Sequence, residues 1–281
     1  MNSKTNVKLI SKPQIGIHIV LLIGALVMII PFFWMALTSF KTVSEATQMN
    51  PFVIFPSVWR TEAYTSVLSK MNFAKLYINT LILIVGRVAC AVITATMAGY
   101  AFARLEFPGK KLAFSLVLFQ MMVPAQIFII PQYLMVSKMN LLNSSFALIF
   151  PGLVSAFGTF LLRQNFMGLP KELEEASVLD GCNIGQTFLY VMLPLTKSAM
   201  VALGIFTAVF AYKDLMWPLV VNTDQATIPL SAALAKLQGQ FVADYPELMA
   251  ASMLAFIPMV IIYILFQRQF IEGIATSGGK L

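Results

Sequence analysis

Three acidic side chains stand close together in one polar stretch of this chain, residues 170–194, which reads PKELEEASVLDGCNIGQTFLYVMLP. Pro170 suits the first position of a helix, and the carboxylates follow in its first turns, where the helix macrodipole favours negative charge: Glu172, Glu174 and Glu175. Gly181 is placed to end this helix, and Asn183 can cap a second short one. At ~1.5 Å per residue the first helix is about 16 Å long. It is too short to cross a bilayer, and we expect a rigid knob on the membrane face.

Charged groups inside apolar runs form a second set. Arg87 lies near the middle of one run, and Lys213 and Asp214 lie late in another. An uncompensated charge there costs at least ~2.5–3.5 kcal/mol, so these groups must face protein or water. One interpretation is a hydrated cavity, in which they and Gln120 hydrogen-bond a hydroxylated solute. The other is an internal ion pair that fixes helix packing, or a side chain that reaches the membrane interface.

Other chemistry finds no support in the sequence. Cys90 and Cys182 lie in different environments and lack metal-ligand spacing, so we expect no metal site and no disulfide framework. No paired carboxylates, His/Cys cluster or nucleophile with a base is visible, which argues against an enzyme. No phosphate-binding GxxxxGK[ST] loop occurs, so any ATP must bind another chain.

Composition indicates a polytopic membrane protein. The chain has 59% hydrophobic and 11% charged residues and a mean hydropathy of +0.82, whereas soluble proteins have about 25% charged residues. At about 20 residues per crossing we predict six spans in one membrane domain covering residues 1–281. They lie near 15–38, 77–102, 112–136, 145–165, 195–217 and 248–267. The first continues too far for a signal peptide, and we expect it to be retained.

Lysine and arginine distribution predicts the orientation. With both termini inside, the inner segments carry Lys4, Lys8, Lys12, Arg104, Lys110, Lys111, Arg163, Lys171, Lys197, Arg268 and Lys280. The outer segments carry Lys41, Arg60, Lys70, Lys75, Lys138 and Lys236. This roughly twofold bias favours cytoplasmic termini and a cytoplasmic acidic stretch. It also explains the net charge of +7 without a nucleic-acid partner.

The acidic stretch also carries a family signature. Glu175-Ala176-Ser177, three further residues, Gly181, a nine-residue gap and the segment 191–194 resemble the EAA motif of ATP-binding-cassette (ABC) importer permeases. Ser177 replaces the second alanine and Val191 replaces isoleucine. Further similar segments are PFFWMALTSFK at 31–41, NTL at 79–81, TIPLSAALAKLQGQF at 227–241 and QRQFIEGIATSGGK at 267–280. Together they resemble the smaller permease subunit of maltose-type carbohydrate importers.

This resemblance implies an all-α, type I ABC importer permease fold with a core at 75–268 and a cytoplasmic coupling loop at 170–194. It implies a plasma (inner) membrane location in a prokaryote. The implied partners are a second permease subunit, an ATPase dimer that binds ATP and Mg²⁺, and an extracellular solute-binding protein, in a lipid membrane. Residues expected to couple to the ATPase are Glu174, Glu175, Ala176, Asp180, Gly181, Leu193 and Pro194.

Two further segments acquire roles by the same resemblance. Gln238, Gly239 and Gln240 are expected to reach the docked binding protein, and the tail with Gly278, Gly279 and Lys280 to insert between the ATPase subunits. The family's aromatic-Asn-acid motif reads Tyr212-Lys213-Asp214 here, so the pattern departs where the pathway is lined.

The sequence therefore predicts a non-catalytic permease subunit of an ATP-driven importer of sugars or oligosaccharides. One alternative is an importer of a non-sugar solute, since other permeases share the EAA loop. Another is an ATPase-independent secondary carrier, but a carrier should show inverted repeats with broken spans and membrane-embedded acids.

Overall fold

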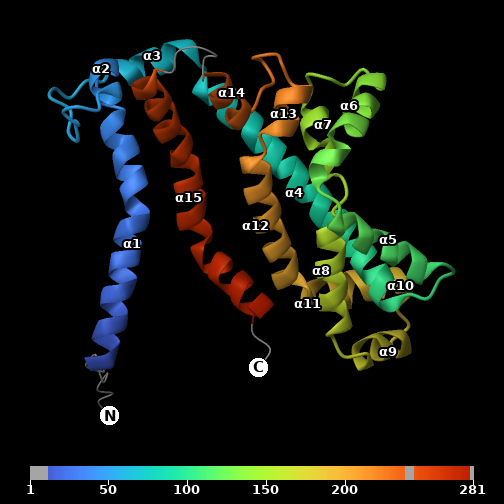
Figure 1. Ribbon diagram of the computed structural model, residues 1–281. Coiled ribbons are helices and arrows are strands. Elements are labelled where there is room, and N and C mark those ends of the chain that lie inside the picture. Colours follow the sequence, from blue (N-terminus) through green and yellow to red (C-terminus); the bar gives the residue numbers. More distant parts are fainter. Residues whose placement is uncertain (1–11, 238–243, 279–281) are drawn as a thin grey trace. The chain divides into compact units, whose positions relative to one another are not determined.

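The computed structural model describes residues 12–237 and 244–278, and this described part is helical without any strand. Figure 1 shows its long helices and short connecting ones. The elements are α1 (Lys12–Thr38), α2 (Val43–Thr47), α3 (Glu62–Lys70), α4 (Phe73–Arg104), α5 (Lys110–Met122), η1 (Ala125–Phe128), α6 (Ile129–Lys138), α7 (Ser145–Ile149), η2 (Phe150–Gly152), α8 (Ala156–Met167), α9 (Glu172–Leu179), α10 (Ile184–Gln186), η3 (Thr187–Met192), α11 (Leu193–Leu195), α12 (Lys197–Lys213), α13 (Met216–Val221), α14 (Leu230–Leu237) and α15 (Tyr245–Gly278).

Each of the six predicted spans has a helical counterpart, but only three are unbroken. The stretches Ile15–Thr38, Phe73–Arg104 and Tyr245–Ile264 are long and apolar enough to cross a membrane. The other three are helix pairs bent by 103° between α5 and η1–α6, by 46° between α7–η2 and α8, and by 73° between the 184–195 segment and α12. Counting each bent pair as one span gives six.

The breaks coincide with residues that cannot continue a helix comfortably. Pro124 precedes η1, and Pro151 lies in η2, as expected from the missing amide hydrogen of proline. At the third break Pro194 lies inside α11. Helix α12 begins at Lys197, after Thr196, whose backbone leaves the helical region. The sixth helix also continues past residue 267 to Gly278.

Contacts separate the described residues into two compact units. One contains the residues up to Met71 and the segment that ends at Ile257, and the other contains Asn72–Leu237 and the residues from Pro258 onward. In the second unit α4 is central and packs against α8 and α12. Glycines permit the close approach of α4 and α8: a Cβ on Gly99 would lie 2.8 Å from the Leu162 Cβ, too close for an L side chain.

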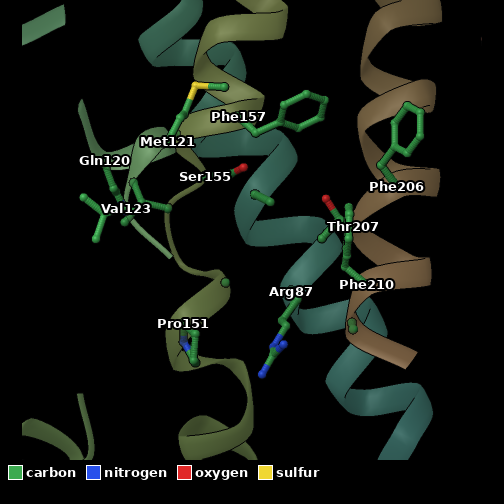
Figure 2. A pocket seen from close by; sticks show the side chains of 15 residues that line it. Arg87, Gln120, Met121, Val123, Pro151, Ser155, Phe157, Phe206, Thr207 and Phe210 are labelled. Atoms are coloured by element: carbon green, nitrogen blue, oxygen red, sulfur yellow. The ribbon is translucent and has the colours of Figure 1, made fainter. Parts of the chain in front are cut away.

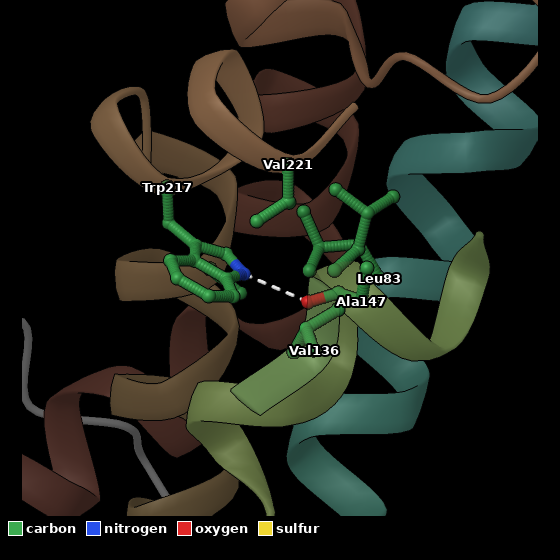
Figure 3. Close-up of a cluster of buried hydrophobic side chains, with 7 residues drawn as sticks. Leu83, Val136, Ala147, Trp217 and Val221 are labelled. Atoms are coloured by element: carbon green, nitrogen blue, oxygen red, sulfur yellow. Dashed lines mark hydrogen bonds between the residues drawn. The ribbon is translucent and has the colours of Figure 1, made fainter. Parts of the chain in front are cut away.

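Two buried clusters stabilise the second unit. Near the beginning of α4, Trp217 packs with Leu83, Val136 and Val221, and its indole N–H donates to the Ala147 carbonyl at 2.7 Å (Figure 3). Near the end of α4, Tyr100, Phe166 and Met192 belong to the other cluster: Ala95, Tyr100, Leu162, Phe166, Met192 and Leu203. Since a buried indole N–H needs an acceptor, the Trp217 bond fixes α13 on α7.

The first unit contains a folded segment between α1 and α3. Lys41 is buried, donates to the Val53 carbonyl at 2.7 Å, and lies 4.0 Å from the Trp34 ring centroid. Phe52 stacks on Trp34 at 5.2 Å. These contacts involve the segment PFFWMALTSFK, which forms the carboxyl-terminal end of α1 and the residues just after it.

Candidate functional site

The knob predicted at residues 170–194 is a helical hairpin with defined ends. Helix α9 begins at Glu172, two residues after Pro170, with three carboxylates in its first turn. Gly181 has a φ of +84°, and its amide donates to the Val178 carbonyl, while the Cys182 amide donates to the Ser177 carbonyl. This pair of bonds is a Schellman motif, in which glycine takes the left-handed conformation at low cost. The prediction that Gly181 ends the helix is confirmed.

Asn183 begins the second arm of the hairpin, as predicted. Its side chain accepts from the Gln186 amide at 3.0 Å, and the Gln186 side chain accepts from the Asn183 amide at 2.9 Å. This reciprocal capping box satisfies two backbone donors at the helix start. The chain then continues through a π-helical segment, η3, to the bend at Thr196.

A buried hydroxyl pair fastens the two arms together. Ser177 is buried, and its hydroxyl lies 2.8 Å from the Thr187 hydroxyl, at the start of η3. The Ser177 hydroxyl also contacts the Glu174 carbonyl at 2.8 Å. Serine therefore contributes a cross-link that the alanine of the usual motif could not make. The sequence alone gave no sign of this contact.

Arg104 connects the hairpin to the long helix α4. Its Nη2 donates to the carbonyls of Phe166 and Leu169, each at 2.6 Å, and its Nη1 lies 3.6 Å from a Glu174 carboxylate oxygen. The side-chain exposures of Arg104 and Glu174 are only 6% and 21%. One guanidinium thus holds the end of α8 and the start of α9 against α4. The sequence assigned Arg104 only to the basic membrane boundary.

The other predicted coupling residues have different environments. Glu175, Ala176 and Asp180 are exposed, Leu193 is half-buried, and Pro194 is exposed. Large apolar side chains beside them are also exposed: Val178 at 64%, Leu179 at 88% and Ile184 at 63%. A helix hairpin with exposed carboxylates and exposed apolar side chains is suited to protein binding.

A second site lies among α4, η2, α8 and α12. It is a pocket of about 610 Å³, and Figure 2 shows Arg87, Ser155 and Thr207 on different segments around it. Gln120 also lines it, so two of the four predicted pathway residues meet there. Aromatic rings form part of the wall: Phe157, Phe206 and Phe210.

Arg87 is held by an ion pair at one side of this pocket. Its Nη1 lies 2.7 Å from an Asp214 carboxylate oxygen, and its Nε donates to the Leu148 carbonyl at 2.9 Å. A Cβ on Gly152 would lie 2.5 Å from the Arg87 Cγ, so glycine makes room for the arginine stem. Nη2 of Arg87 is buried and has no partner in the described part of the chain.

The remaining predicted residues are either outside this pocket or outside the described part of the chain. Lys213 ends α12 and is exposed, and it does not line the pocket. Gln238, Gly239 and Gln240 lie outside the described residues, as do Gly279 and Lys280. Gly278 is the last residue of α15.

The structure brings together two segments singled out in the sequence. The Asn79 amide donates to the carbonyls of Ala226 and Ile228 at 3.1 and 3.0 Å, and the Thr80 hydroxyl accepts from the Leu230 amide at 2.9 Å. This contact anchors the start of the TIPLSAALAKLQGQF segment on α4. The spacing of these residues in the sequence gave no sign of it.

Comparisons with known proteins agree with this geometry. The chain is 30% identical to the diacetylchitobiose uptake system permease protein NgcG of Streptomyces coelicolor, over 93% of this chain and 87% of that protein. It is 31% identical to the arabinooligosaccharides transport system permease protein AraQ of Halalkalibacterium halodurans, over 91% of this chain and 92% of that protein.

A solved structure has the same fold. It is a bacterial ABC transporter involved in the import of the acidic polysaccharide alginate, which aligns with a TM-score of 0.77 over 95% of this chain and 99% of the matched chain, at 24% identity. Residues 91–275 match the family described as the binding-protein-dependent transport system inner membrane component. The chain belongs to this family of membrane-embedded transporter permease subunits.

Proposed function

We propose that this permease imports sugars or oligosaccharides, forms half of the translocation pathway, and transmits ATP hydrolysis through the 170–194 hairpin. The observation that carries the proposal is the family match together with a pre-organised hairpin fixed to α4. The relatives named for diacetylchitobiose and arabinooligosaccharides support a carbohydrate substrate.

The hairpin is suited to transmit force. The Schellman motif ends its first helix, and the capping box begins its second. The Ser177–Thr187 hydrogen bond joins the two arms, and Arg104 joins the base of the hairpin to α4. A segment constrained in this way moves as a unit, because a displacement of α9 must pull on α4. We assign its exposed carboxylates and apolar side chains to the groove of a partner ATPase.

The pocket suits a neutral hydroxylated solute. Phenylalanine rings offer flat apolar faces for the C–H surface of a sugar ring, while Gln120, Ser155 and Thr207 offer hydrogen-bonding groups. The unpartnered Nη2 of Arg87 supplies a donor. Because Asp214 compensates the Arg87 charge, the wall has no excess positive charge to select an anion. This favours an uncharged saccharide over a phosphorylated solute, which is the second candidate.

The assembly follows from the same assignment. We propose a second permease subunit, an ATPase dimer that holds ATP and Mg²⁺, and an extracellular binding protein as partners, with both termini of this chain cytoplasmic. The segment 238–240 is assigned to the binding protein, and the tail from Gly278 to the ATPase subunits. The basic bias of the inner segments supports this orientation.

The test is uptake by the complete complex in proteoliposomes. We expect Gln120→Leu with Thr207→Val to reduce uptake of neutral oligosaccharides, offered with the cognate binding protein, by about tenfold, because each loses a hydrogen bond. Thr65→Val, on the exposed face of α3, is the control and should transport normally. Wild-type uptake by the double variant would remove this pocket from the pathway, and preferential uptake of phosphorylated sugars would favour the second candidate.

A further inference from the structure

A second hollow lies at the turn between α4 and α5. It has a volume of about 790 Å³ and combines basic and aromatic side chains. Its lining includes Lys110, Lys111 and Arg163 with Phe102, Phe107 and Phe114. These cations contribute to the basic bias that predicts the orientation of the chain, and they do not line the pocket beside Arg87.

Arg163 is held in place by its neighbours. Its Nε donates to the Phe102 carbonyl at 3.2 Å, and its guanidinium carbon lies 4.1 Å from the centroid of the Phe114 ring. Neither terminal amino group of Arg163 has a partner among the described residues. A guanidinium fixed in this way retains a fork of donors, which is the geometry that binds phosphate oxygens.

The charge balance of the hollow is positive. Lys110 is occupied, because its Nζ lies 3.0 Å from the Glu106 carboxylate and 2.7 Å from the Leu105 carbonyl. Lys111 is exposed and has no ion pair in the described part of the chain. Lys111 and Arg163 are therefore two uncompensated cations beside one hollow.

The hollow lies at the end of a candidate membrane span. Helix α4 ends at Arg104 and α5 begins at Lys110, so the turn between two apolar helices forms one wall. Arg163 lies in the last part of α8, just before the 170–194 hairpin, and belongs to the same compact unit as that turn. Phenylalanine rings and basic groups at this depth match the two parts of a phospholipid, its glycerol and acyl portion and its headgroup.

We propose that this hollow binds the phosphodiester of an anionic glycerophospholipid from the leaflet on the hairpin side. Arg163 and Lys111 contact the phosphate oxygens, and the aromatic wall contacts the glycerol and upper acyl chains. A free phosphate has the same headgroup chemistry but gains nothing from three phenylalanine rings, which favours the lipid. The bound lipid would lie beside α8 and α4, the two helices that Arg104 joins to α9.

The experiment measures lipid retained by the complete complex. The complex is equilibrated in nanodiscs of phosphatidylcholine with a minor fraction of phosphatidylglycerol, extracted in mild detergent, and analysed by mass spectrometry for bound lipid. We expect the wild type to retain phosphatidylglycerol in excess of its bulk fraction. Lys111→Gln and Arg163→Gln should each lower this excess by about tenfold, as expected for the loss of a charge-assisted hydrogen bond.

Matched variants distinguish binding at this hollow from a general attraction of anionic lipid to the positive charge of the protein. Lys138→Gln removes an exposed cation at the end of α6 and should leave the retained lipid unchanged. Lys111→Gln changes an exposed side chain that makes no ion pair with any described residue, so it tests the site even if Arg163→Gln folds poorly. Equal retention by Lys111→Gln, Lys138→Gln and wild type would overturn the proposal, as would a wild type without excess phosphatidylglycerol.

Inorganic phosphate distinguishes the two sources of the anion. Phosphate is titrated into the complex in pure phosphatidylcholine nanodiscs. It should not raise the unfolding temperature of the wild type more than that of Arg163→Gln. An Arg163-dependent rise equal to that given by phosphatidylglycerol would assign the hollow to a soluble anion and overturn the lipid assignment.

Discussion

At the scale of single residues, buried charges in this protein are compensated by particular partners. Arg87 and Asp214 have side-chain exposures of only 10% and 22%, and they lie 127 positions apart in the chain. Removing one partner of a buried pair leaves the other charge without compensation, which costs more than the pair itself contributes. The ion pair, one of the two interpretations left open by the sequence, is present, and Arg87 also lines the pocket. Hydrogen bonding to a solute there stays a prediction.

We expect Asp214→Ala to destabilise the complex by about 3 kcal/mol, the lower end of the range for breaking a buried ion pair. Arg87→Met combined with Asp214→Ala should recover part of this loss, because the lone charge is gone. Thermal unfolding in detergent measures both. Glu62→Ala, which breaks the exposed pair with Arg60, is the control and should change the stability by less than about 1 kcal/mol. Equal effects of Asp214→Ala and the double variant would contradict the argument.

Glu45 gives a prediction about pH. Hydrogen bonds from the Ser57 side chain and from the Thr42 and Ser57 backbone lower the pKa of Glu45 from its ordinary 4.5 to about 2. A lowered pKa in the folded state contributes stability above pH 4.5 that is lost as the pH falls toward 2. Pepsin cleavage within residues 48–59, divided by the cleavage rate of an unstructured reference peptide at the same pH, should therefore increase over this window. In Glu45→Gln this normalised rate should lack the increase, and an unchanged increase would assign it to another group.

At the scale of elements, the sequence predicted those helices whose ends are marked by capping or helix-ending residues and those that form long apolar runs. Gly181, Asn183 and the long apolar runs were sufficient to predict the hairpin and the unbroken spans. The bend at Thr196 and the link from Arg104 to Glu174 were missed. The link depends on packing between segments far apart in the chain, and local periodicity carries no information about such contacts. The bend lies at the non-helical backbone of Thr196, a residue type that does not by itself mark a helix break.

Gly181→Ala tests the hairpin as an element. No atom lies within 4 Å of the added Cβ, so the only cost is a left-handed backbone, about 1–2 kcal/mol. We expect the variant to assemble but to transport less solute per ATP hydrolysed, because the Schellman closure of α9 is weakened. Gly185→Ala is the control, since its new Cβ has an ordinary contact of 3.4 Å with Asn183. If Gly181→Ala moved as much solute per ATP hydrolysed as the wild type, the Schellman motif at the end of α9 would have no part in coupling.

At the scale of the whole molecule, the lysine and arginine bias predicts that the hairpin and the 42–60 segment face opposite sides of the membrane. One candidate span, in α1, lies between the amino terminus and the 42–60 segment, so these two parts are expected on opposite sides. The two bent pairs that precede the hairpin must both cross the membrane, or both turn back, for the hairpin to return to the amino-terminal side. The fold alone does not fix which side of the membrane the hairpin faces, whereas the lysine and arginine bias predicts the cytoplasmic side.

Native Cys182 tests this arrangement directly. It is half-exposed within the hairpin, and Cys90→Ser leaves it as the single thiol. A membrane-impermeant maleimide should label Cys182 in inverted vesicles but not in spheroplasts, whereas a cysteine introduced at exposed Ser69, with Cys182→Ser, should show the opposite pattern. If the ATPase docks on the hairpin, adding purified ATPase to stripped inverted vesicles should slow labelling of Cys182 several-fold. Labelling of Cys182 from the outside would reverse the topology, and labelling that the ATPase leaves unchanged would argue against the assigned docking surface.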